Sequence, residues 1–216
     1  MGKSYTIKRV KLEGKDIKEV WETIPEAVID CYPWADNGYM PKAKAKVFYT
    51  DSHFHVFFQA YEDQIRAVYS QLNDPVCRDS CVEFFFNPNP EEDNRYMNIE
   101  MNPIGTFLLG LGKDRHDRIL VSDVSGDLLQ ISTSVDKESL KSYTGPFWTV
   151  EYAIPFSFIQ RFYGPLDFKP GWRMKGNFYK CGDDTPKPHF GCWNGVVSLI
   201  PDFHRPECFG DFILGE

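Results

Sequence analysis

Two segments near the middle of the chain alternate between apolar and polar side chains. Residues 80–86 are β-branched or aromatic and end at an Asn-Pro-Asn-Pro run, and residues 96–102 alternate strictly. Successive side chains of a strand point to opposite faces, and proline ends a strand because it lacks a ladder donor. The pattern predicts a β-hairpin with one apolar face: Val82, Phe84, Phe86, Met97, Ile99 and Met101. Its second face carries Cys81, Glu83, Phe85, Tyr96, Asn98, Glu100 and Asn102.

Strand patterns recur along the rest of the chain, and long helical patterns do not. Strands are expected at residues 5–12, 43–49, 54–61, 106–111, 128–135, 148–154, 171–181 and 208–214. Short helical turns are expected at residues 17–21, behind an Asp16 N-cap, and at residues 156–162. Without a repeat or a linker, the pattern predicts a single domain over residues 1–216. Its expected fold class is all-β, a two-sheet antiparallel β-sandwich of jelly-roll or immunoglobulin-like type with short helical turns.

One long segment, residues 182–205, has almost no alternation. It contains two prolines in Thr185-Pro-Lys-Pro188 and a third at Pro201, two histidines and several aromatic rings. A loop of this length inside a compact domain is usually functional or disordered, and its aromatic density argues against disorder. We therefore expect it to form the second wall of a binding site.

The charge balance bears on the partners of the protein. The 216-residue chain has a formal net charge of −7, which argues against nucleic acid and anionic membrane surfaces as partners. No apolar run approaches the roughly 20 residues of a membrane-spanning helix. The first residues, MGKSYTIKRVKLEGK, lack the apolar core of a signal peptide, so a cytoplasmic location is expected unless an export signal was trimmed. No pattern indicates an oligomeric state.

The second face of the hairpin has the chemistry of a site for a neutral ligand rich in hydroxyl groups. Glu83, Asn98 and Glu100 offer carboxylate and amide groups that pair with vicinal hydroxyls, and a solvated sheet face is the alternative interpretation. Phe203 and Trp193 are candidate stacking platforms for a sugar ring, and core packing beneath the loop is the alternative.

Four segments in the same order resemble a known family. They are RDSCVEFFFNP, YMNIEMNPIG, FWTVEYAIPF and FHRPECFGDFIL. Together they resemble the family 9 carbohydrate-binding modules and their DOMON-like relatives, which include single-domain bacterial "carbohydrate-binding family 9-like" proteins. The resemblance spans roughly residue 42 to the C-terminus. It implies a β-sandwich that binds a mono- or oligosaccharide without catalysis, with the sugar between two aromatic rings and polar side chains on its hydroxyls.

The resemblance carries over to some positions and not to others. It implies a ligand contact for Glu83, a sandwiching ring at Phe203 and a polar contact at Tyr179. The other ring of the family falls near residues 76–77, where this chain has Val and Cys, so Trp193 or Trp34 would have to replace it. A contacting arginine of the family is replaced at Glu100. Arg78 and His204 complete the candidate ligand-binding residues, which are Arg78, Glu83, Asn98, Glu100, Tyr179, Trp193, Phe203 and His204.

Metal and disulfide chemistry stays open at this level. His53 and His55 share a strand face, but no Cys or carboxylate lies at ligand spacing. Cys181 and Cys192 are free thiols, a disulfide, or metal ligands with His189. Some members of the family carry structural calcium, and residues 91–93, Glu-Glu-Asp, have the composition of a calcium loop, although their spacing matches no defined one. No cofactor is assigned.

Two other functions are kept as alternatives. Glu83 and Glu100 would serve a glycoside hydrolase if their carboxyl groups lay about 5 Å apart. A haem-binding DOMON-like domain would need axial Met and His ligands, for which Met97, Met101 and His189 are available. Because no motif of an established catalytic class is present, a binding module is the preferred interpretation over an enzyme.

Overall fold

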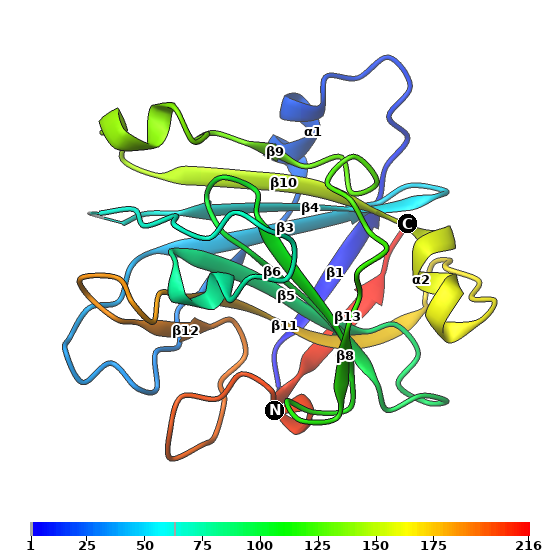
Figure 1. Cartoon of the computed structure of the whole chain (residues 1–216). Helices are drawn as coiled ribbons and strands as arrows, with labels where there is room; N and C mark the ends of the chain where they lie inside the picture. The colour runs from blue at the N-terminus through cyan, green and yellow to red at the C-terminus, as the bar shows by residue number, and fades with distance from the viewer. Residues whose placement is uncertain (1, 63) are drawn as a thin grey trace.

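The computed structural model describes residues 2–62 and 64–216, so Met1 and Asp63 of the predicted domain lie outside the described residues (Figure 1). The strands are β1 Ser4–Arg9, β2 Ala27–Ile29, β3 Ala43–Tyr49, β4 His53–Ala60, β5 Cys81–Asn87, β6 Tyr96–Met101, β7 Phe107–Gly112, β8 Arg118–Leu120, β9 Ser132–Thr133, β10 Trp148–Pro155, β11 Arg173–Cys181, β12 Phe190–Cys192 and β13 Gly210–Leu214. The helices are α1 Ile17–Thr23 and α2 Phe156–Tyr163, with 3-10 turns at Val76–Arg78, Ser139–Ser142 and Pro206–Cys208. No helix in these described ranges has the length and apolar character needed to cross a membrane.

The strands form two layers that share β1 (Figure 1). The first layer, sheet A, has the order β8-β7-β6-β5-β11-β13-β1, with β12 beside β11. The second layer, sheet B, has the order β1-β3-β4-β10-β9, with β2 beside β3. The β-sandwich prediction is confirmed. Strand β1 differs from the expected antiparallel pattern, because it runs parallel to β13 at its start and parallel to β3 at its end.

The predicted central hairpin is β5 and β6, and its register is antiparallel. Glu83 lies opposite Glu100, and Phe85 lies opposite Asn98. The apolar face of the hairpin packs in the core between the sheets, together with Phe178 of β11 and Trp148 of β10. Because the side-chain period of a strand is two, the same register places the second face on the outer side of sheet A.

The outer face of sheet A is buried around the central hairpin. The alternative interpretation from the sequence, a sheet face exposed to solvent, is therefore wrong. Every residue of β5, β6 and β7 is buried. A second apolar cluster, with Phe85, Tyr96, Tyr179, Phe203 and Phe209 among its members, covers this face. Segments on either side of the hairpin in the sequence therefore fold over it, and its carboxylates and amides lie beneath them.

Some short elements differ from the sequence prediction. Only Ser132–Thr133 of the strand expected at residues 128–135 is extended, and Gln130 just before it has a φ of 50°. Strands β2, β8 and β12 were not predicted. Each has three residues, which is too short for a period-two pattern to be recognised, and pairing with a longer neighbour keeps it extended. Helix α1 begins at its predicted cap, where the Asp16 side chain accepts a hydrogen bond from the Lys18 backbone amide.

Candidate functional site

A cavity of about 200 Å³ opens on the outer face of sheet A. Its residues come from β5, β6, β8 and β11, from the 3-10 turn Val76–Arg78, from the turn before β8, and from segment 182–205. They are Cys77, Glu83, Glu100, Arg115, Arg118, Cys181, Asp183, Phe190, Pro201, Asp202, Phe203 and His204. Both the hairpin and the long segment therefore contribute, as expected for the floor and wall of one site.

The floor of the cavity holds two opposed carboxyl groups. Glu83 and Glu100 are 2% and 4% exposed and lie directly opposite each other on β5 and β6. Burial, and then the charge of Glu100, raise the pKa of Glu83 well above its ordinary value. Burial also raises the pKa of Glu100, while the nearby Arg118 guanidinium lowers it. Like charges directly opposite on a sheet are unfavourable, so the pair favours a single negative charge, and the Arg118 guanidinium beside Glu100 favours that charge on Glu100.

Arg118 links the floor to segment 182–205. Its Nη1 atom lies 3.4 Å from Oε1 of Glu100 and donates to Nε2 of His204 at 3.2 Å. With Nε2 accepting, Nδ1 of His204 carries the proton and donates to the Tyr96 hydroxyl at 2.7 Å. Burial, followed by the charge of Arg118, lowers the pKa of His204 to about 3, which keeps the imidazole neutral. The result is a guanidinium held between the Glu100 carboxyl group and the His204 imidazole.

The aromatic wall is formed by Phe203 and Phe190. The Phe203 ring stacks on Tyr179, with ring centroids 4.2 Å apart and planes inclined by 13°. The Tyr179 hydroxyl also donates to the Phe203 backbone carbonyl at 3.0 Å. Tyr179 is fully buried and supports the wall from behind, so one face of the Phe203 ring is already covered. Phe190 meets Phe203 edge to face at 6.4 Å.

Four predicted site residues lie away from the cavity lining: Tyr179, which supports Phe203 from behind, and Trp193, Asn98 and Arg78. Trp193 is 4% exposed and packs between the two sheets, stacked on Phe212 with ring centroids 5.5 Å apart. This corrects the expectation that Trp193 is an accessible stacking platform, because the segment turns its ring inward. Asn98 is fully buried and donates from Nδ2 to Oε1 of Glu100 at 2.9 Å, so it orients that carboxylate. Arg78 is exposed and lies beside Tyr69 and Asp184.

The sequence interpretation missed the two arginines of the cavity, Arg115 and Arg118, and two of its acids, Asp183 and Asp202. Arg115 pairs with Asp202 at 3.0 Å, which ties the turn before β8 to segment 182–205. Asp183 lies at the rim, and burial, followed by the charge of Asp184, raises its pKa to about 6. The available signal was the charged run at residues 113–118, which the sequence analysis did not connect to the hairpin.

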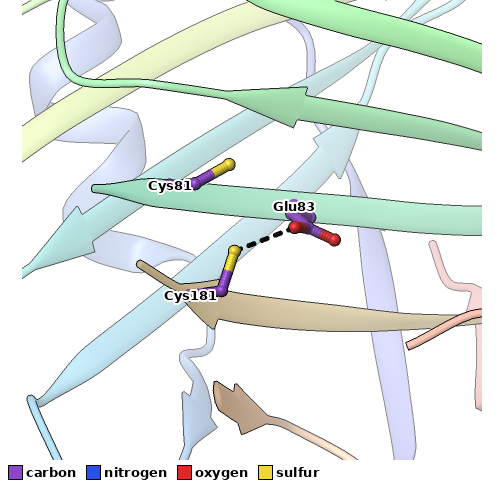
Figure 2. Close-up of side chains that lie close together, drawn as sticks. All are labelled: Cys81, Glu83 and Cys181. Carbon is purple, nitrogen blue, oxygen red and sulfur yellow. Dashed lines mark hydrogen bonds between the residues drawn. The ribbon is translucent and has the colours of Figure 1, made fainter. Parts of the chain in front are cut away.

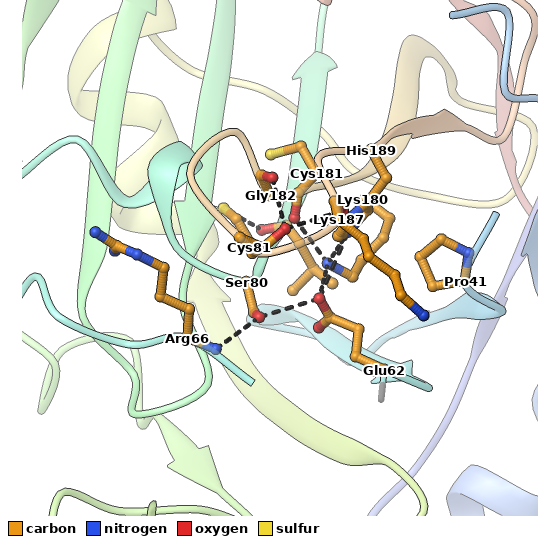
Figure 3. A network of polar contacts seen from close by, with 12 residues as sticks. Pro41, Glu62, Arg66, Ser80, Cys81, Lys180, Cys181, Gly182, Lys187 and His189 are labelled. Atoms are coloured by element: carbon orange, nitrogen blue, oxygen red, sulfur yellow. Dashed lines mark hydrogen bonds and ion pairs between the residues drawn. The ribbon is translucent and has the colours of Figure 1, made fainter. Parts of the chain in front are cut away.

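Lys180 and Glu62 form a buried ion pair at the end of the inter-sheet core (Figure 3). The Lys180 ammonium lies 3.2 Å from Oε1 of Glu62 and donates to Nε2 of His189 at 2.8 Å. Ser80 and Trp148 donate to the same Glu62 carboxylate at 3.0 and 2.6 Å. Burial, followed by the charge of Lys180, lowers the pKa of His189 to about 3. His189 is therefore a neutral acceptor within a structural network.

The residues considered for metal binding or a disulfide have other partners in the structure or are free thiols. The Asp93 carboxylate is held by Arg95, at 2.6 Å to Nη2, so the loop at residues 91–93 does not fit a calcium site. His55 stacks on Phe48 at 4.5 Å, and no three-donor group in the described ranges includes it. Cys181 and Cys192 are both free thiols.

The haem alternative needs a Met and a His that face one open space. Met97 and Met101 are buried in the inter-sheet core, whereas both ring nitrogens of His189 have partners in the network and the adjacent loop. These side chains do not form an axial pair.

Comparison with family models identifies the chain. The model of carbohydrate-binding family 9 matches residues 15–214. The chain belongs to carbohydrate-binding family 9. For this family 9 domain the resemblance deduced from four sequence segments is confirmed, and membership of a binding-module family suggests a non-catalytic domain. A comparison with curated proteins gave no match.

Solved structures support the same fold. A protein from Bacteroides uniformis ATCC 8492, for which carbohydrate binding has been suggested, is 29% identical with a TM-score of 0.84, over 99% of this chain and 100% of that chain. A family 9 module from Caldicellulosiruptor kristjanssonii in complex with cellotriose is 13% identical with a TM-score of 0.65, over 99% and 94% of the two chains. A family 9 module from the same organism in complex with glucose is 14% identical with a TM-score of 0.64, over 99% of this chain and 97% of that chain.

Proposed function

We propose that this family 9 domain binds a mono- or oligosaccharide non-covalently in the cavity on the outer face of sheet A. The observation that carries the proposal is the combination, in one cavity, of Glu83, Glu100 and Arg118 with the Phe203 ring. A sugar presents hydroxyl groups that both donate and accept, together with an apolar face of ring C–H groups. The cavity offers partners for each of these features.

The polar partners differ in their hydrogen-bonding roles. Ionised Glu100 accepts from sugar hydroxyls, while the Arg118 guanidinium donates to them. Protonated Glu83 adds a second donor beside them, because its Oε1 atom already accepts from the Cys181 thiol at 3.0 Å. Adjacent donors and acceptors match a pair of vicinal hydroxyls. In this proposal Arg118 takes the role of the arginine that the resemblance predicted near Glu100.

The aromatic contact is one-sided. Tyr179 covers one face of Phe203, so a sugar can stack only on the remaining face, and Phe190 meets the wall at an angle. A small cavity with one stacking ring favours a single bound sugar unit, as a monosaccharide or as the end of a short chain. Affinity is expected between micromolar and millimolar, because few atoms are buried and the hydroxyl groups must lose water.

Titration calorimetry with glucose, cellotriose and a panel of other mono- and oligosaccharides tests the proposal. We expect saturable heat with at least one sugar and a loss of at least about tenfold in affinity for Glu100→Gln, since a hydrogen bond to a charged group contributes about 1.5–3 kcal/mol. Glu91→Gln, at an exposed site outside the cavity, is the matched control and should bind normally. Absence of heat with every sugar, or equal affinity of Glu100→Gln and the control, would refute the proposal.

A further inference from the structure

Two cysteines and one glutamate meet behind the floor of the cavity (Figure 2). Cys81 of β5 and Cys181 of β11 are register partners, and Glu83 follows two residues later on the same face of β5. The two sulfurs and one carboxylate oxygen all lie within 4.8 Å of one another. Within residues 2–62 and 64–216, no other three Cys, His, Asp or Glu side chains converge in this way.

The three side chains are buried, and two of them reach the cavity. Cys81, Cys181 and Glu83 are 0%, 1% and 2% exposed. Cys181 and Glu83 line the cavity, whereas Cys81 is not among its lining residues. The Cys181 thiol donates to Oε1 of Glu83 at 3.0 Å (Figure 2). An ion that enters through the cavity would therefore meet this S–H···O pair and take the place of its proton.

The donor set is selective for thiophilic cations. Thiolates favour Zn²⁺ over the hard ions Mg²⁺ and Ca²⁺. Zinc bonds of about 2.3 Å to sulfur place two tetrahedral thiolate ligands about 3.8 Å apart, so the two sulfurs here need to approach one another by no more than about 1 Å. The Cys181 sulfur and the Glu83 oxygen, 3.0 Å apart, need to separate by about 0.5 Å. Three protein ligands with a free fourth position form an open zinc site. At this site the free position faces the cavity, because Glu83 and Cys181 belong to its lining.

Two cations, each already paired with a glutamate, lie near the negative charge that metal binding would create. Two thiolates and one carboxylate around a divalent ion leave one net negative charge. The Lys180 ammonium is bonded to the Cys181 carbonyl at 2.7 Å, and Arg118 lies at the same floor beside Glu100. A nearby positive charge lowers the cost of burying a negatively charged complex.

We propose that Cys81, Glu83 and Cys181 form a binding site for a thiophilic divalent cation, with Zn²⁺ as the preferred ion. The free coordination position of the bound cation faces the cavity. Binding releases the protons of both thiols to the solvent, and that of Glu83 where it is protonated. Because Glu83 is shared with the proposed sugar site, the bound cation also changes sugar affinity. Cation binding itself does not depend on the sugar proposal.

Titration of the reduced full chain with Co²⁺ or Cd²⁺ in the absence of sugar tests the site. Both ions report thiolate ligation by an ultraviolet charge-transfer absorbance, and we expect one equivalent to saturate it. Cys81→Ser and Cys181→Ser should each weaken binding by at least about tenfold, and Glu83→Gln should weaken it while keeping the sulfur absorbance. Competition with Zn²⁺ should remove the probe signal.

The control uses the other neighbouring thiol pair of the chain. Cys31 and Cys192 are bridge partners, with the Cys192 thiol donating to the Cys31 carbonyl at 3.3 Å. Cys31→Ser should leave the titration unchanged. Loss of the signal in Cys31→Ser, its persistence in Cys181→Ser, or absence of charge-transfer absorbance in the wild type would each overturn the proposal. Near-ultraviolet circular dichroism verifies that each variant is folded, and sugar calorimetry with a chelator tests sugar binding separately.

Discussion

Glu83 and Glu100 face each other across neighbouring strands, both buried at the floor of one cavity, and the ion pair of Arg118 is with Glu100. This asymmetry separates their protonation states. Glu100 has a cation at 3.4 Å, and Glu83 has a thiol donor and a like-charged neighbour. Two chemically identical side chains thus become a donor and an acceptor within one site.

The protonation of Glu83 predicts how stability depends on pH. Its folded pKa lies above its ordinary value of 4.5, so the folded state holds this proton longer than the unfolded state. The contribution of Glu83 to stability is therefore complete below that ordinary value and is lost as pH rises through the folded pKa. Glu83→Gln has no carboxyl group to ionise at this position, so it does not undergo this loss. As pH rises, the free energy of unfolding of Glu83→Gln minus that of the wild type should therefore increase by up to about 1.4 kcal/mol per pH unit.

Urea unfolding of both proteins from about pH 5 upward measures this difference, because the loss begins where the unfolded carboxyl group ionises. The lowered pKa values of His189 and His204, about 3, have the opposite effect: their contribution to stability is present above 6.5 and is lost as pH falls below it. Both histidines are present in the wild type and in Glu83→Gln, so their contribution cancels in the comparison. Parallel stability curves for the wild type and Glu83→Gln would show that Glu83 is ionised in the folded protein.

Arg118 is expected to be the main cationic contact of a bound sugar. Arg118→Met should weaken sugar binding by at least about tenfold, because it removes a charge-assisted donor and leaves Glu100 without its partner. Calorimetry with the best sugar of the panel measures the effect. Arg173→Met, at an exposed position on β11, is the matched control and should bind as the wild type does. Equal affinities for the two variants would exclude this role.

The Lys180–Glu62 pair is expected to support the fold rather than the ligand. Lys180→Met leaves a buried carboxylate without its counter-ion and should lower the free energy of unfolding by about 3–5 kcal/mol. Adding Glu62→Gln should recover much of that loss. The control is Lys175→Met on the same strand, whose pair with Asp211 is about half exposed and should contribute less than about 1 kcal/mol. Denaturant unfolding distinguishes these cases, and similar losses at both lysines would contradict the prediction.

Trp193 is expected to act through packing. Trp193→Ala should cost about 3–5 kcal/mol of stability, because it leaves a cavity beside Phe212 and Phe178 in the inter-sheet core. Sugar affinity of the folded fraction should stay within about twofold, since the ring does not line the cavity. Thermal unfolding and calorimetry on the same preparation measure both quantities. A large loss of affinity with unchanged stability would restore Trp193 as a ligand contact.

Much of the fold could be predicted from local patterns. The alternation at residues 80–86 and 96–102 specified the β5–β6 hairpin and assigned each side chain to the correct face. The Asp16 cap marked the start of helix α1 in the same way. Such signals depend on the strand period, on proline and on capping chemistry, all of which act between neighbours in the sequence.

The site was predictable only in part, because its members meet through long-range packing. Sequence reasoning selected Glu83, Glu100 and Phe203, and all three line the cavity. Arg118 was missed, since nothing in a short charged run indicates which buried carboxylate it will face. Trp193 was placed wrongly, because the inward turn of an irregular segment depends on the surface that receives it.

The sequence by itself determined most of the longer strands, the two faces of the central hairpin and the family. Only the tertiary structure decided that the polar face is buried, that Arg118 pairs with Glu100, and that two cysteines join Glu83 behind the floor. The physical reason is the range of the interactions. Alternation is a property of adjacent residues, whereas the bond between Tyr96 and His204 joins positions 108 residues apart and exists only after both sheets and the covering segment have packed.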